Sequence, residues 1–157
     1  MKPTTSLLKR ATLSGTFASL ASTLALLYGG VRDCRSAIAP VNAVSHWIWK
    51  DKAIRQQRPS MRYSAAGYLI HHAASIFWAL TYERLLTSRA PEPVRTEIAV
   101  SAVTVAAVAC VVDLRCTPER LTPGFERRLE NKSLVTVYTA FALGLALHSL
   151  LRARDRR

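Results

Sequence analysis

The sequence predicts an all-α integral membrane protein, a four-helix bundle with short interfacial amphipathic helices. Four apolar runs are each long enough to cross a bilayer as a helix. The connections between them carry most of the 22 Lys and Arg residues, which outnumber 10 Asp and Glu residues for a net charge of +12. Small residues also recur every four positions along the runs, as in helices that associate within lipid. The 157 residues are therefore expected to form a single transmembrane domain.

The first apolar run contains no charged residue and follows Lys2, Lys9 and Arg10. Its length and the lack of a clear cleavage site favour a retained anchor over a cleaved signal peptide. The third run is rich in Val, but its length and lack of alternation favour a helix over a strand. Because lipid offers the backbone no hydrogen-bond partners, all four runs should be helical. We place the spans at about 11–29, 64–83, 94–114 and 133–151.

Two connections are expected to carry short helices at the membrane surface. In VNAVSHWIWKDKAIRQQRP, apolar residues recur at helical spacing and basic residues follow, with Trp47 and Trp49 suited to headgroup level. In the third connection, Thr122 suits an N-cap and Pro123 the first position of a helix. These patterns predict interfacial segments at about 41–55 and 123–131.

The distribution of charge indicates which partners to expect. Cationic flanks around apolar runs suit a lipid bilayer with anionic headgroups. No basic helix or aromatic RNA-binding motif accompanies the charge, so nucleic acid is not expected as a partner. A membrane-protein partner or a second copy of the chain stays open. Lys and Arg divide almost evenly between the two sides of the predicted membrane, so the positive-inside rule does not orient the chain.

Ionisable residues inside the apolar runs are the first candidates for a site, because placing them in lipid is costly. His71 and His72 lie near the middle of the second run, and Asp113 ends the third run. These three residues form a candidate polar or ion site. His71 shares a small-residue row with Gly67 and should face the bundle interior, whereas His72 is rotated by about 100°.

Glu83 and His148 form a second polar pair near the opposite side of the predicted membrane, where Glu83 should meet His148 or Arg84. A b-type haem would need two imidazoles at one depth. At a rise of ~1.5 Å per residue, His71 lies about 10 Å into its span and His148 about 22 Å into a parallel one. Haem is therefore the less favoured alternative.

The composition favours a structural or accessory membrane protein, with no cofactor expected. The alternative is a small proton- or metal-handling transporter that uses His71, His72 and Asp113. An enzyme would need a nucleophile next to a base. Ser75 lies one helical turn after His71 and makes the one such pairing at this spacing in the apolar runs, but no GxSxG motif surrounds it. The sequence therefore favours a non-enzymatic role, and no catalytic residue is assigned.

The three cysteines form no CxxC pair, which argues against a zinc ribbon or a thioredoxin-like motif. Cys34 and Cys116 lie near the ends of apolar runs on the same predicted side of the membrane. If that side is periplasmic, these two cysteines could oxidise together.

Three stretches resemble an uncharacterised family of small four-span inner-membrane proteins of proteobacteria: APVNAVSHWIWKDKA, GYLIHHAASIFWALTYE and CTPERLTPGFERRL. The resemblance covers roughly 39–150, and RLTPGFE is its most specific part. It implies a multi-pass protein of the bacterial inner membrane and implies no activity. Leu114 follows Asp113, whereas that family often has an aromatic residue at this position. A role for such an aromatic residue is therefore not expected in this chain. The interfacial loop candidates are Asn42, His46, Trp49 and Glu126.

Overall fold

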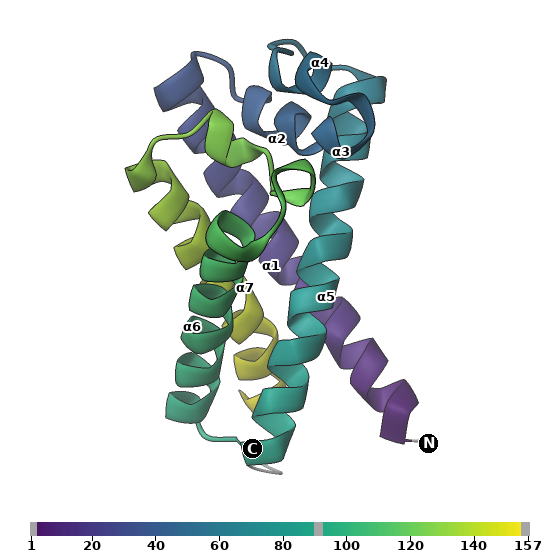
Figure 1. The fold of residues 1–157 in the computed structure, drawn as a ribbon. Coiled ribbons are helices and arrows are strands. Elements are labelled where there is room, and N and C mark those ends of the chain that lie inside the picture. Colours follow the sequence, from purple (N-terminus) through teal and green to yellow (C-terminus); the bar gives the residue numbers. More distant parts are fainter. Residues whose placement is uncertain (1–2, 90–92, 155–157) are drawn as a thin grey trace.

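The computed structural model describes residues 3–89 and 93–154, and every regular element in these ranges is helical. The all-α prediction is therefore confirmed. Four long helices carry most of the described chain (Figure 1): α1 (Pro3–Cys34), α5 (Ala66–Arg89), α6 (Arg95–Val111) and α7 (Asn131–Arg154). Two of them have short π-helical extensions, η1 (Met61–Ala65) before α5 and η2 (Val112–Cys116) after α6.

Three helical segments are long and apolar enough to cross a membrane: Ser6–Cys34, Arg95–Cys116 and Asn131–Arg154. They contain most of the predicted first, third and fourth spans. Within the described residues, α5 is outside this set. The adjacent imidazoles of His71 and His72 in its first half lower its mean hydropathy. The second predicted span is therefore a helix, but its crossing of a membrane stays a prediction.

The four long helices contact one another with α1 as the central element. α1 packs against both α5 and α7, and α6 packs against α7 and α5. In Figure 1 the start of α1, the end of α5, the start of α6 and the end of α7 lie at one end of the molecule, here called the terminal end. The two longer connections lie at the other end, here called the connection end.

Small residues let α1 approach its neighbours closely, as the four-residue spacing predicts. A Cβ atom built on Gly15 would lie only 2.7 Å from the Cα atom of Ile76 on α5. A Cβ atom on Gly144 of α7 would collide with the backbone of Ala18 on α1. These contacts bring the helix backbones together at two crossings. At Gly15 and Gly144, the small residues spaced four apart therefore face the interior, as predicted.

The predicted interfacial helix over 41–55 is instead three short helices, α2 (Ala39–Val44), α3 (His46–Trp49) and α4 (Asp51–Ile54). The chain breaks at Ser45 and at Lys50, whose φ of 51° is incompatible with a continuing right-handed helix. Every residue of α2 is buried, and α2 packs against α5 and α1. The apolar face of this segment, predicted to face the membrane, is therefore part of the protein core at Val41 and Val44.

The predicted helix over 123–131 is also not a regular α-helix. Gly124 adopts φ 86°, which stops a right-handed helix from starting at Pro123, and a single 3₁₀ turn, η4 (Phe125–Arg127), follows. Thr122 donates its hydroxyl hydrogen to the Glu119 carbonyl, at 3.1 Å, instead of capping a helix. A second 3₁₀ turn, η3 (Glu119–Leu121), precedes it.

The buried side chains form two clusters, one toward each end. The terminal-end cluster draws on α1, α5, α6 and α7 and includes Ala18, Tyr82, Leu86, Ile98, Phe141 and Leu145. The connection-end cluster joins α1 and α7 to the loops and includes Leu26, Val41, Val44, Phe125, Leu129 and Val137. The two polar sites described next lie beside these two clusters.

Candidate functional site

A cavity of about 520 Å³ lies between α5 and α6, next to the loops of the connection end. Alanines on the facing helices leave this space open: Ala73, Ala74 and Ala109. Aromatic side chains make up much of the wall: Trp47, Phe77, Trp78, Phe125, Tyr138 and Phe141. Two ionisable residues, His71 and Asp113, also line it, so part of the predicted polar site is on this wall.

His71 reaches the cavity wall from α5 and is tied to α1. Its Nε2 lies 2.8 Å from the Ser22 hydroxyl, which itself donates to the Ala18 carbonyl at 2.7 Å. Because a serine hydroxyl has a single hydrogen, this arrangement assigns the imidazole proton to Nε2, which donates to Ser22. His71 Nδ1 is then left as a hydrogen-bond acceptor.

Asp113 lies on η2 and accepts a hydrogen bond from the Tyr138 hydroxyl of α7 at 3.1 Å. The Trp78 indole of α5 lies beside the same carboxylate. None of the ion pairs in the described part of the chain includes Asp113. A carboxylate without a basic partner on an aromatic wall is the main electrostatic feature of the cavity.

His72 does not join the other two predicted site residues. It lies outside the cavity wall, and its ring stacks on Tyr68 with the ring centroids 5.8 Å apart. Its Nδ1 atom is buried without a hydrogen-bond partner. Across the described residues, no group of three or more His, Cys, Asp or Glu side chains could hold a metal ion. His71, His72 and Asp113 thus do not form a three-ligand metal site.

The four loop candidates have separate structural positions. Asn42 organises the first connection: its amide donates to the Arg58 carbonyl at 3.1 Å and its Oδ1 accepts from Ser64 at 2.7 Å. His46 is buried, with Nδ1 3.0 Å from the Ala43 carbonyl and Nε2 without a partner. These two residues therefore hold the backbone of the connection, and neither lines the cavity.

Trp49 and Glu126 lie apart from each other. The Trp49 ring packs edge-on against Tyr63 at 5.4 Å, and the Arg62 guanidinium sits over it at 5.1 Å. Glu126 is mostly buried, and its Oε2 atom has no hydrogen-bond partner. It is close enough to Asp113 to act on that carboxylate electrostatically.

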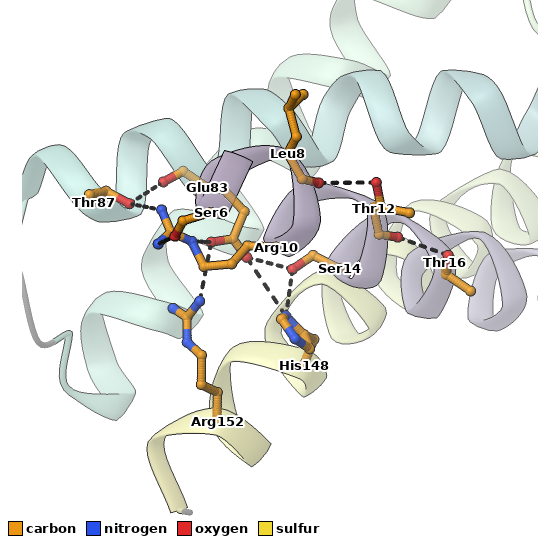
Figure 2. Close-up of polar contacts among 10 residues, drawn as sticks. All are labelled: Ser6, Leu8, Arg10, Thr12, Ser14, Thr16, Glu83, Thr87, His148 and Arg152. Atoms are coloured by element: carbon orange, nitrogen blue, oxygen red, sulfur yellow. Dashed lines mark hydrogen bonds and ion pairs between the residues drawn. The ribbon is translucent and has the colours of Figure 1, made fainter. Parts of the chain in front are cut away.

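The second polar site is a cluster at the terminal end, called the Glu83 cluster here. It joins three helices (Figure 2): Arg10 and Ser14 of α1, Glu83 and Thr87 of α5, and His148 and Arg152 of α7. The Glu83 side chain is fully buried. Ser14 donates to Glu83 Oε1 at 2.5 Å, and Arg10 Nε donates to Oε2 at 3.2 Å.

The α7 residues complete the Glu83 cluster. Arg152 Nη1 lies 3.8 Å from Glu83 Oε2, and His148 Nδ1 lies 3.9 Å from Oε1. His148 Nδ1 is also 3.0 Å from the Ser14 oxygen. Since Ser14 gives its single hydrogen to Glu83, the imidazole proton belongs on Nδ1 and is donated to Ser14. The predicted approach of Glu83 to His148 is present in this network.

Arg84, the other partner considered for Glu83, is exposed and takes no part in the cluster. Sequence reasoning missed Arg10, Ser14 and Arg152. Arg10 and Arg152 flank apolar runs, where arginine is expected to contact lipid headgroups. A long side chain at the edge of such a run can also turn inward. The four-residue spacing of Arg10 and Ser14 was the available signal, because it places both on one face of α1.

The two imidazoles that a haem would need lie at different levels. His71 contacts Ser22 of α1, whereas His148 contacts Ser14 of the same helix. Eight residues of helix separate these contacts by about 12 Å. One iron could not accept both imidazoles in this arrangement, which agrees with the depths estimated from the sequence.

All three cysteines are free thiols. Cys34 is partly buried and donates to the Arg128 carbonyl at 2.8 Å, whereas Cys116 is exposed. Pairing of Cys34 with Cys116 stays a prediction.

Comparison of the chain with protein-family models, with curated proteins and with solved structures finds no match. The resemblance carried by the three sequence stretches therefore remains an expectation, and the site is interpreted from its own geometry.

Proposed function

We propose that the chain is an integral protein of the bacterial inner membrane that crosses it four times as a helical bundle and has a structural or accessory role. The observation that carries the proposal is how the ionisable groups are used. Glu83, His148, His71 and Asp113 each contact a polar side chain on a different long helix. In lipid, such interhelical contacts fix the geometry of a bundle and keep polar groups away from the hydrocarbon.

The outer surface supports a lipid environment. Large apolar side chains are exposed along the long helices, among them Leu20, Leu24, Phe77, Val103, Leu143 and Leu147. Large apolar side chains exposed in such number are unfavourable in water and favourable against acyl chains. The three segments long and apolar enough to cross a membrane support the same view. Crossing by α5 is part of the proposal.

The connection end has groups suited to anionic headgroups. Trp49, Tyr63 and Arg62 form an aromatic and cationic group in which the guanidinium lies 5.1 Å from one ring and 5.5 Å from the other. Tryptophan and tyrosine favour the interface between hydrocarbon and water, and arginine favours phosphate. We propose that this group anchors the connection end at the headgroup level of an anionic leaflet.

Labelling of single cysteines tests the four-span topology. In a background without the native cysteines, one cysteine is placed at Gln57, at Ser88 or at Cys116, all of which are exposed. A membrane-impermeant maleimide is then applied to intact and to permeabilised cells. We expect positions 57 and 116 to be accessible from the same side and position 88 from the other.

The possible outcomes distinguish the alternatives. If positions 57 and 88 are accessible from the same side, α5 does not cross the membrane and the four-span proposal is wrong. If the chain is recovered in the soluble fraction after cell lysis, it is not integral to the membrane. Reaction of position 88 only after permeabilisation would also place the terminal end in the cytoplasm.

A further inference from the structure

We propose that the cavity between α5 and α6 binds a lipophilic organic cation, a molecule with one positive charge on an apolar body. This goes beyond a structural role and rests on different observations from the topology. The volume of about 520 Å³ falls within the range of small-molecule sites, and the wall is apolar with few polar groups, as such sites usually are.

The sign of the ligand's charge follows from the acids of the cavity. The Asp113 carboxylate is on the wall, and the groups that donate to it from other helices are neutral: the Tyr138 hydroxyl, at 3.1 Å, and the Trp78 indole. The nearby carboxylate of Glu126 adds negative charge, and the neighbouring Arg127 guanidinium lies 3.9 Å from it. An anion would be repelled here, and a neutral ligand would leave Asp113 without a counter-charge.

The aromatic wall suits the same class of ligand. Trp47 and Trp78 come from α3 and α5, and Tyr138 comes from α7, so rings approach the cavity from several elements. A cation over the face of an indole or phenol ring is attracted electrostatically, most strongly where water is excluded. His71 also lines the cavity, and its Nδ1 atom is left as an acceptor by the bond to Ser22.

The route into the cavity favours a ligand that partitions into lipid. Ala73 and Phe77 both line the cavity and are exposed on the outer surface of α5. The cavity is therefore accessible from the side of the helices. A hydrophilic cation would have no such path if α5 faces hydrocarbon, whereas a lipophilic one would reach it from the bilayer.

A pair of ions with the same shape and opposite charge tests the proposal. Tetraphenylphosphonium and tetraphenylborate are titrated separately into the full chain in mild detergent, and tryptophan fluorescence is followed, because Trp47 and Trp78 line the cavity. We expect saturable binding of the phosphonium ion and at least about tenfold weaker binding of the borate ion, since loss of one strong charge interaction changes affinity by about that factor.

Three variants complete the test. Asp113→Asn keeps an acceptor for Tyr138 and should weaken phosphonium binding about tenfold or more. Glu130→Gln removes the same charge from an exposed side chain and should leave binding unchanged. Ala74→Leu fills the cavity and should abolish binding, and thermal unfolding of each variant checks that the fold is retained.

Each result bears on the proposal directly. Equal binding of both ions would make the cavity a generic apolar site and overturn the choice of a cation. Full phosphonium affinity in folded Asp113→Asn, or in folded Ala74→Leu, would place any binding elsewhere. Absence of saturable phosphonium binding to the native chain would refute the proposal without affecting the labelling test of topology.

Discussion

Replacing Glu83 with glutamine should weaken the packing of α1, α5 and α7 together. The fully buried carboxylate accepts from Ser14 at 2.5 Å and from Arg10 at 3.2 Å, and Arg152 lies 3.8 Å away. Glutamine can still accept from Ser14 as a neutral group, which gives up about 1 kcal/mol of a charge-assisted bond. The side chains of Arg10 and Arg152 are each 26% exposed, so water compensates part of their lost counter-charge.

The total effect of Glu83→Gln follows from these terms. Removing one partner of a fully buried ion pair costs about 3–5 kcal/mol, and the partial exposure of both arginines lowers this figure. We therefore expect the free energy of unfolding to fall by about 2–3 kcal/mol. The measurement is unfolding by sodium dodecyl sulfate in mixed micelles, followed by far-ultraviolet circular dichroism.

Glu130→Gln serves as the matched control, because its side chain is 73% exposed and its ion pair with Arg32 spans 3.8 Å. This control should show no measurable change. If Glu83→Gln is no less stable than the control, the Glu83 cluster does not hold the three helices together. A double variant with Arg10→Gln should also lose less than the sum of the two single variants, and strict additivity would mean that Arg10 and Glu83 do not interact.

Two further changes test the packing. Gly144→Ala should lower the free energy of unfolding by about 1–2 kcal/mol, because the collision with the α1 backbone outweighs the better helix propensity of alanine. The control is Leu143→Ala, on the outward face of α7. A Gly144→Ala variant more stable than wild type would contradict the close crossing of α1 and α7. His71→Gln keeps a hydrogen-bond donor for Ser22 of α1 and should leave the free energy of unfolding nearly unchanged. His71→Leu should lower that free energy by about 1 kcal/mol in the same assay. Equal stability of the two variants would mean that this hydrogen bond contributes nothing to stability.

The long helices could be predicted because one physical property, an apolar run of sufficient length, determines them in any context. The depth of Glu83 along its run predicted that it meets His148 or Arg84, and Glu83 lies 3.9 Å from His148. The rotation of about 100° between adjacent residues likewise separated His71, on the cavity wall, from His72, which stacks on Tyr68.

The connections could not be predicted in the same way, because packing against other elements decides their shape. The apolar spacing around Val41 indicated an interfacial helix, yet α2 is buried where Gly67 of α5 lets its backbone come into contact with the Val41 carbonyl. A Cβ atom on Gly124 would meet the Ala43 carbonyl and the His46 ring, each at 2.5 Å. Such contacts between distant segments leave no periodic pattern in the sequence.

The composition of the Glu83 cluster has a consequence for how the chain assembles during synthesis. Its carboxylate is on the second long helix, and its partners come from the first and the last, α1 and α7. When α5 is synthesised, Arg10 and Ser14 are already available, so one arginine and one hydroxyl can receive the acid. Arg152 and His148 arrive only when α7 has been synthesised. The cluster therefore makes completion of the helical packing depend on α7, and a chain that ends before α7 should leave Glu83 without two of its basic partners.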